Sequence, residues 1–185
     1  MNDYETVRAK VESILTPGFS YQDGKFVYDK VCELPEDALI LEIGSWQGRS
    51  TCAMGFACVG TRRRIVSVDV EPEGEPSRTG FRRNVVAMGL RELVTEIIGD
   101  SRQVMKGWTT PLDFAFIDGN HDYPFVLSDF ELTYPWIKHG GWIAFHDMDD
   151  PATPGISKMW NEAASKLLDC HQRVAGSCIL AGRKP

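Results

Sequence analysis

Five short apolar runs, each separated from the next by a stretch that suits a helix, constrain the fold more than any other feature of the sequence. The runs are ALILEI (38–43), RIVSVDV (64–70), LVTEII (93–98), LDFAFID (112–118) and GWIAFHD (141–147). Runs that are apolar on both faces are typical of strands buried in a parallel sheet. Their alternation with helical stretches predicts a doubly wound α/β sheet.

The stretches between these runs carry apolar spacing and terminal signals that predict helices. They cover Gly48 to Cys58, Phe81 to Met88 followed by Gly89, Pro124 to Ile137 followed by Gly140 and Gly141, and a stretch that begins at Thr153-Pro154. The last segment, HQRVAGSCILAGRKP, has two strand-like runs around Ala175-Gly176, which predict an antiparallel hairpin. Together these features predict an α/β fold, a three-layer α/β/α sandwich with a seven-stranded, mostly parallel sheet.

The first 36 residues do not follow this alternation. Their pattern predicts a helix from Asp3 to Leu15 and a second near Lys25 to Cys32, joined by the loop TPGFSYQDG (16–24). We interpret residues 1–36 as an N-terminal helical cap on a core formed by residues 37–185. At this length the chain, residues 1–185, is expected to form a single domain.

Charge and composition exclude several functional classes. The formal net charge of −6 disfavours a general role in nucleic-acid binding. No stretch approaches the ~20 apolar residues that a membrane-spanning helix needs, and the charged N-terminal sequence is unlike a signal peptide. The five cysteines lack CxxC spacing, which indicates buried or partly buried free thiols in a reducing compartment. We therefore expect a cytoplasmic protein with neither nucleic-acid nor membrane partners.

The first apolar run leads into LEIGSWQGRST, a turn with two glycines four positions apart. Parallel α/β sheets bind ligands beyond the carboxyl ends of their strands, where a glycine permits close approach of a ligand. The turn is not the GxGxxG turn of dinucleotide-binding proteins, because Trp46 stands where the second glycine would be. Glu42 would repel a pyrophosphate but suits an ammonium group, whereas Ser50 and the following helix N-terminus suit a carboxylate. The turn is therefore predicted to bind the amino-acid end of a ligand.

Asp69 ends the second apolar run. A carboxylate at this position of a doubly wound sheet accepts hydrogen bonds from the hydroxyls of a ribose. The ligand would then carry an amino-acid end near the first strand and a ribose near the second. S-adenosylmethionine carries both groups, and we predict that it is the cofactor.

Five segments over residues 38–148 resemble the S-adenosylmethionine-dependent methyltransferases with a Rossmann-like fold. In chain order they are LEIGSWQGRS, VSVDVEP, IIGDSRQ, DFAFIDGNHDYP and LTYPWIKHGGWIAFHDMD. Within this group the sequence is most similar to the metal-dependent O-methyltransferases, both the catechol-type enzymes and the small bacterial enzymes with an IDG-x-H segment. The resemblance implies that residues 1–185 form a single methyltransferase domain.

The resemblance also implies a set of cofactor-binding residues. They are Glu42, Gly44, Ser45, Trp46, Gly48 and Ser50 around the methionine part, Asp69 and Val70 at the ribose, Asp100, Ser101 and Gln103 by the adenine, and Asp118. Two alternatives stay open. Asp100 and Ser101 also suit the cap of a following helix, and Trp46 suits either the core or a wall of the site. Phe19 and Tyr21 lie in the cap loop, which could close over the cofactor as N-terminal segments do in similar enzymes.

Two further strand ends, IDGNH and FHDMDD, are expected at the same edge of the sheet and bring Asp118, His121, His146 and Asp147 together. Clustered carboxylates suit a hard divalent cation such as Mg²⁺ or Mn²⁺. The resemblance implies Asp118, His146 and Asp147 as metal ligands. His146 departs from the family pattern, because relatives usually carry a carboxylate or an amide there. An imidazole ligand would favour a more borderline ion, or His146 does not ligate at all.

His121 falls three positions after Asp118, where the catechol-type enzymes carry a catalytic lysine. A histidine titrates near neutral pH and suits a general base. The open alternatives are that it caps the next helix or binds substrate or metal. The candidate catalytic residues are His121, Asp118 and Asp147.

The predicted function is metal-assisted O-methylation of a small hydroxylated molecule with S-adenosylmethionine. Open alternatives are a metal-independent methyltransferase and a non-catalytic protein that binds S-adenosylmethionine or a nucleotide, whereas the turn sequence argues against a nicotinamide dehydrogenase. Acceptor specificity is expected in the N-terminal cap and in the loops EPEGEPSRTG (71–80) and MDDPATPG (148–155). The acceptor site is either open or completed by a second subunit of a homo-oligomer.

Overall fold

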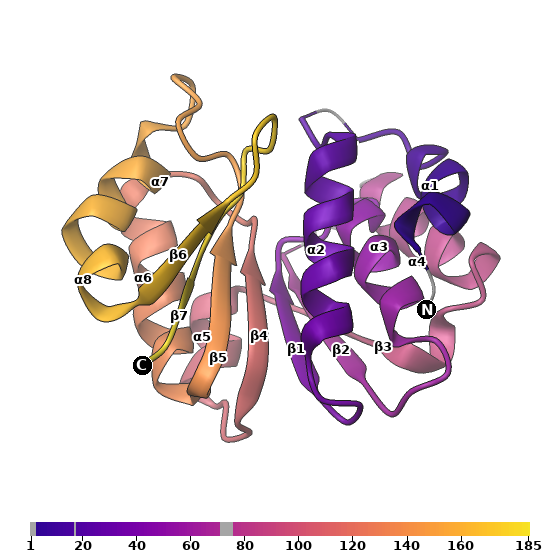
Figure 1. Cartoon of the computed structure of the whole chain (residues 1–185), viewed down its shortest axis with the longest axis horizontal. Helices are drawn as coiled ribbons and strands as arrows, with labels where there is room; N and C mark the ends of the chain where they lie inside the picture. Colours follow the sequence, from indigo (N-terminus) through magenta and orange to yellow (C-terminus); the bar gives the residue numbers. More distant parts are fainter. Residues whose placement is uncertain (1–2, 17, 71–75) are drawn as a thin grey trace.

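A seven-stranded sheet crosses the middle of the molecule in the computed structural model, which describes residues 3–16, 18–70 and 76–185 (Figure 1). The strand order is β3-β2-β1-β4-β5-β7-β6. The strands are β1 (Leu39–Ile43), β2 (Arg64–Asp69), β3 (Val94–Ile98), β4 (Leu112–Ile117), β5 (Ile137–Phe145), β6 (Asp169–Arg173) and β7 (Leu180–Arg183). Strands β1 to β5 pair in parallel, while β7 pairs antiparallel with both β5 and β6. The predicted Rossmann-like three-layer fold with an antiparallel C-terminal hairpin is confirmed.

Helices cover both faces of the sheet. They are α1 (Tyr4–Glu12), α2 (Tyr21–Glu33), α3 (Arg49–Cys58), α4 (Pro76–Ala87), α5 (Ser101–Lys106), α6 (Tyr123–Thr133), α7 (Pro154–Met159) and α8 (Ser165–Leu167), with 3₁₀ turns at Arg91–Leu93 and Tyr134–Trp136 and a π-helical segment at Trp160–Ala164. Figure 1 shows α1 to α4 on one side of the sheet and α5 to α8 on the other.

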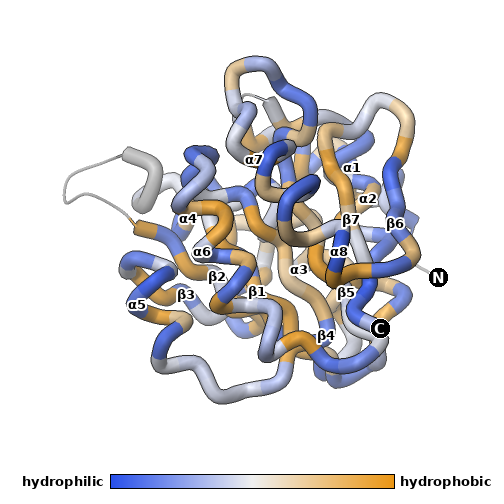
Figure 2. The backbone as a smooth tube through the Cα atoms, turned by 90° about the vertical axis from the view of Figure 1, so that its left-hand side faces the viewer, coloured by the Kyte–Doolittle hydropathy of each residue, from blue (hydrophilic) through white to orange (hydrophobic). Residues whose placement is uncertain are grey.

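Successive residues of the central strands β1 and β4 belong to the core on opposite sides of the sheet. Ile40 and Phe114 pack with buried residues of α1 to α4, whereas Leu41 and Ala115 pack with those of α5 to α7. Successive side chains of a strand point to opposite faces, so a strand apolar at every position must be covered twice. Figure 2 shows the same arrangement, with hydrophobic residues mainly along the strands in the middle and hydrophilic ones mostly at the periphery.

The chain reverses its direction of winding between β1 and β4, which are neighbours in the sheet. Ligands of doubly wound sheets bind at this switch point. Gly44 follows β1 with φ of 83°, and a Cβ there would lie 2.1 Å from the carbonyl oxygen of Asp118. The glycine was expected to admit a ligand, but it is the backbone after β4 that approaches it. The turn after β1 is thereby held against the end of β4.

The boundary between α6 and β5 differs from the prediction, which extended the helix to Ile137. The helix ends at Thr133 and a 3₁₀ turn follows, because Pro135 has no N–H with which to continue the helix. The predicted stop signal, Gly140-Gly141, lies inside β5. A Cβ at Gly141 would lie 2.9 Å from the carbonyl oxygen of Asp113, so the glycine permits close approach of two strands.

The second helix starts earlier than predicted. Ser20 and Asp23 form a reciprocal capping box that begins α2 at Tyr21, inside the segment that was expected to be a loop. Pro17, in the same segment, lies outside the described residues.

The lengths of the helices and the exposure of the cysteines bear on two expectations from composition. No helix within the described part of the chain is long and apolar enough to cross a membrane. All five cysteines are free, and Cys52 and Cys58 are buried. Cys32 and Cys170 are exposed, so the expectation that every thiol is at least partly buried was wrong.

Candidate functional site

A cavity of about 610 Å³ lies at the carboxyl ends of the strands and collects most of the predicted site residues. The predicted residues that line it are Gly44, Ser45, Trp46, Ser50, Asp69, Val70, Asp100, Ser101, Asp118, His121, His146 and Asp147. Glu42, Gly48 and Gln103 do not line it. Residues that were not predicted also contribute, including Arg49 and Asp129.

The turn after β1 is fixed by Asp69 at the end of β2. Its Oδ2 accepts hydrogen bonds from the backbone N–H groups of Ser45, at 2.7 Å, and Trp46, at 2.8 Å. Among the described residues, no hydrogen bond involves its other carboxylate oxygen. Trp46 has φ of 40° and is 45% exposed. Of the two interpretations of this side chain, it is therefore a wall of the cavity and not a core aromatic.

Glu42 is buried behind the turn after β1 and does not line the cavity. It is fully buried, and its two oxygens accept hydrogen bonds from the hydroxyls of Ser50, at 2.6 Å, and Thr51, at 2.5 Å. Burial raises the pKa of Glu42 to about 7, although the two hydroxyls favour the charged form. The structure thus differs from the predicted contact of Glu42 with a ligand: the carboxyl group anchors the first turn of α3.

The buried carboxyl group predicts a pH-dependent effect of Glu42→Gln on stability. Glu42 has an ordinary pKa of 4.5 and a folded-state pKa of about 7, so its favourable contribution is lost as the pH rises through 7. Between pH 5 and pH 8 the variant should gain about 2 kcal/mol in free energy of unfolding relative to the unchanged chain. Urea unfolding at the two pH values measures this gain. Glu131→Gln, an exposed change on α6, is the control and should give none.

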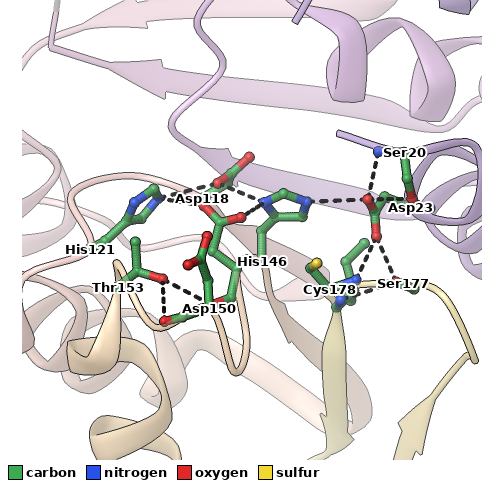
Figure 3. Close-up of polar contacts among 11 residues, drawn as sticks. Ser20, Asp23, Asp118, His121, His146, Asp150, Thr153, Ser177 and Cys178 are labelled. Atoms are coloured by element: carbon green, nitrogen blue, oxygen red, sulfur yellow. Dashed lines mark hydrogen bonds and ion pairs between the residues drawn. The ribbon is translucent and has the colours of Figure 1, made fainter. Parts of the chain in front are cut away.

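Asp118 and His121 after β4 and Asp147 after β5 converge in the cavity. Figure 3 shows the side chains of Asp118 and His121 pointing toward each other. His121 Nε2 lies 3.5 Å from Asp118 Oδ1 and 3.3 Å from Asp147 Oδ2. The neighbouring carboxylate of Asp118 raises the pKa of His121 against the effect of burial. One ligand atom from each of the three lies within 4.8 Å of the others, a grouping that can hold a metal ion. Asp147 has φ of 55°, a strained conformation of the kind that clusters at functional sites.

His146 lies behind this group and not in it. Its Nδ1 is 3.0 Å from Asp147 Oδ1 and 3.4 Å from Asp118 Oδ1, and its Nε2 is 3.5 Å from Asp23 Oδ2. Burial lowers the pKa of His146, but the three carboxylates outweigh burial and raise it well above its usual range. His146 is not among the three residues whose ligand atoms lie within 4.8 Å of one another, so its role as a metal ligand stays a prediction, and His121 stands in the group instead.

Asp23 is a further residue that the sequence analysis missed, and it lies behind His146. It is fully buried at the start of α2 and accepts hydrogen bonds from the Ser20 backbone N–H and the Ser177 hydroxyl, both at 2.7 Å, and from the Cys178 N–H at 3.0 Å (Figure 3). Burial opposes its charge, but the contact with His146 and the hydrogen bonds from Ser177 and Ser20 lower its pKa. The spacing of Ser20 and Asp23 signals a helix start, but nothing local signals the contacts with the last hairpin.

The residues after β3 combine capping with cavity lining. Asp100 caps α5 by accepting from the N–H of Arg102 at 2.9 Å and also pairs with its guanidinium, so the capping alternative is confirmed. The hydroxyl of Ser101 donates to Asp129 at 2.5 Å. Burial raises the pKa of Asp129 to about 6. Gln103, exposed on α5, is not part of the cavity.

Solved structures similar to this chain share its fold. An O-methyltransferase from Bacillus cereus in complex with SAH is 22% identical, with a TM-score of 0.70 over 97% of this chain and 89% of that one. The SAH-bound methyltransferase PaMTH1 of Podospora anserina is 16% identical, with a TM-score of 0.74 over 98% and 86%. The O-methyltransferase TomG of Streptomyces achromogenes, in complex with SAM, is 17% identical, with a TM-score of 0.69 over 100% and 92%.

Sequence comparison identifies the family. A curated protein of Acanthamoeba polyphaga mimivirus, named Uncharacterized protein R132, is 46% identical over 39 residues, a match that covers 21% of this chain and only 18% of the viral protein. The family model described as Methyltransferase domain matches residues 41–148, more than half of the chain. The turn after β1, Asp69, Asp118 and Asp147 all lie within this match. The chain belongs to the methyltransferase-domain family.

Proposed function

We propose that the chain methylates a hydroxyl group of a small molecule, with a divalent cation held by Asp118, His121 and Asp147. The observation that carries the proposal is the convergence of these three side chains within 4.8 Å, in the same cavity as the turn after β1. Two carboxylates and an imidazole suit a borderline to hard ion, Mn²⁺ more readily than Mg²⁺. When bound, such an ion lowers the pKa of an acceptor hydroxyl and fixes its position.

The cofactor-binding roles of the cavity residues are part of the proposal. S-adenosylmethionine supplies the electrophilic methyl group. We assign the ribose to Asp69, whose Oδ1 is not engaged by the turn, with Val70 beside it. Trp46 and Ser45 line the cavity, and we assign Asp118 a place between cofactor and acceptor. Asp100 and Ser101 border the adenine end from the start of α5.

Other predicted residues support the site without lining it. Glu42 orients the Ser50 hydroxyl from below. Gly48, with φ of 80°, packs where a Cβ would lie 3.0 Å from the ring of Phe81 on α4. Both residues therefore shape the turn, and we assign them no contact with the cofactor.

A metal-independent reaction is the second candidate, and one observation favours it. His146 Nδ1 is buried 3.0 Å from Asp147 and 3.4 Å from Asp118, and these carboxylates raise the pKa of His146 and so favour its charged form. In that case His121, oriented by the same two carboxylates, would take the proton of the acceptor hydroxyl as a general base. The two candidates differ in one measurable property, the requirement for metal.

The acceptor is proposed to be a small hydroxylated molecule bound beyond His121. A second hollow of about 290 Å³ adjoins this residue and is lined by Ala152–Gly155, part of the predicted loop MDDPATPG, and by Lys158. The Streptomyces achromogenes enzyme with the same fold is involved in tomaymycin synthesis, which supports a small-molecule acceptor. The other predicted loop, EPEGEPSRTG, lies outside the described residues at positions 71–75.

The metal requirement is tested by calorimetric titration with Mn²⁺ and with Mg²⁺ after dialysis against a chelator, in the presence of S-adenosylhomocysteine. We expect saturable binding of one Mn²⁺, and we expect the dialysed protein to regain methyl transfer to a catechol or a related hydroxylated acceptor when Mn²⁺ is added. Binding of S-adenosylhomocysteine without any metal binding would favour the metal-independent candidate. Full transfer in the presence of chelator would have the same meaning.

A further inference from the structure

Arg49, the first residue of α3, lines the cavity and has no acidic partner among the described residues. Its guanidinium lines the cavity, lies 3.4 Å from the carbonyl oxygen of Thr16 and stands 5.7 Å from the ring centre of Phe19. No ion pair within residues 3–16, 18–70 and 76–185 involves it. Arg102, the other arginine that lines the cavity, is held by Asp100.

Two polar atoms at this position are buried without a hydrogen-bond partner in the described chain. They are Nε of Arg49 and Oγ1 of Thr16. Buried donors are nearly always paired in folded proteins. Donors of this kind, grouped around a guanidinium, indicate a site for an anion.

The rest of the cavity is acidic and would repel an anion. The carboxylates that line it belong to Asp69, Asp100, Asp118, Asp129 and Asp147. S-adenosylmethionine carries one carboxylate, at its methionine end. Ser50 was expected to bind this carboxylate, but its hydroxyl hydrogen is donated to Glu42. The turn therefore lacks the expected side-chain donor, and Arg49 stands one residue before Ser50 with its charge unpaired.

We infer that Arg49 binds the carboxylate of S-adenosylmethionine, with the hydroxyl of Thr16 beside it. A guanidinium binds a carboxylate through two parallel hydrogen bonds, which gives direction as well as affinity. The contact would join the first residue of α3 to the N-terminal wall formed by Thr16 and Phe19. The inference concerns the cofactor alone, so it holds whatever the acceptor and whether or not a metal is required.

The test compares two ligands that differ only in the carboxylate: S-adenosylhomocysteine and its decarboxylated analogue, S-adenosyl-3-thiopropylamine. Calorimetric titration is performed on the unchanged chain, on Arg49→Met and on Arg102→Met, each checked for its thermal unfolding midpoint. We expect the unchanged chain to prefer S-adenosylhomocysteine by roughly 30-fold or more, as for a partly desolvated charge pair. Arg49→Met should lose this preference and bind both ligands alike. Arg102→Met, the matched control, should weaken both by the same factor and keep the preference.

Two further results distinguish carboxylate binding by Arg49 from a purely structural role. Arg49→Lys should keep part of the preference, since it retains the charge without the planar fork. If Arg49→Met weakens both ligands by the same factor, the residue only supports the N-terminal wall and the inference is wrong. An unchanged preference in Arg49→Met would also overturn it. Metal or acceptor experiments that fail would leave this comparison unaffected, because it measures neither.

Discussion

Asp147→Asn is expected to reduce methyl transfer by roughly 10³-fold, the scale associated with loss of a general acid–base or metal-holding carboxylate. Asparagine keeps the size of the side chain and tolerates the left-handed backbone at this position, where φ is 55°. The change therefore removes charge with little change of shape. Binding of S-adenosylhomocysteine should change by less than about threefold, because the proposed cofactor contacts lie mainly on the turn after β1 and on Asp69. Single-turnover transfer and calorimetry measure the two effects.

Asp149→Asn is the matched control for this prediction. Asp149 also has a positive φ, 64°, and lies two residues away, but its carboxylate is paired with Arg173 and accepts from Ser157 outside the cavity. Methyl transfer by Asp149→Asn should stay within a factor of about two to three of that of the unchanged chain. Retained transfer in Asp147→Asn would remove both candidate mechanisms. Equal losses in the two variants would point to a disturbed loop and not to a lost catalytic group.

The second large effect is expected for stability, on Asp23→Ala. The change leaves His146 without one of three neighbouring carboxylates and leaves Ser177 and the Cys178 N–H without an acceptor. Breaking a buried ion pair from one side costs about 3 to 5 kcal/mol. For a chain of this size that corresponds to a fall of roughly 10 °C in the thermal unfolding midpoint. Urea and thermal unfolding at neutral pH measure the loss.

Two further variants test whether the loss of stability comes from the contact between Asp23 and His146 or from a general effect on α2. Asp29→Ala removes a half-exposed acid of the same helix, paired with Lys25, and should cost less than about 1 kcal/mol. Asp23→Asn combined with His146→Gln removes both charges, and should cost less than the sum of the two single changes. A strictly additive double variant would contradict the ion-pair explanation, as would a loss in Asp29→Ala equal to that in Asp23→Ala.

The sheet was predictable because its strands are apolar on both faces. LDFAFI, for example, is buried at every position of β4, and only a strand covered by two layers of helices accounts for that pattern. The start of β5 was not predictable in the same way. Its glycines have the local pattern of a helix end. A glycine is required at position 141 because the backbone of Asp113, on another strand, approaches it closely. Boundaries set by non-local contacts leave no local signal.

The same distinction applies to the site. Asp118, His121 and Asp147 were expected together because parallel strands bring their carboxyl ends to one edge. The role of His146 could not be read from the sequence, since it depends on Asp23 of a helix far away in the chain. Arg49 was passed over because a charged residue at a helix start is usually solvated. In the structure its Nε is buried without a hydrogen-bond partner among the described residues, which distinguishes Arg49 from a solvated arginine.

The hydrogen bond between Asp23 and Ser177 spans 154 positions of the sequence and has a consequence for the order of folding. Closing a loop of this length costs on the order of 4 kcal/mol in chain entropy before any contact offsets it. Contacts of such sequence separation tend to form late, after local helices and neighbouring strands have docked. A folding intermediate with its central strands already paired would therefore still lack the support behind His146. The reaction centre would be among the last parts of the molecule to mature, however early the cofactor turn takes shape.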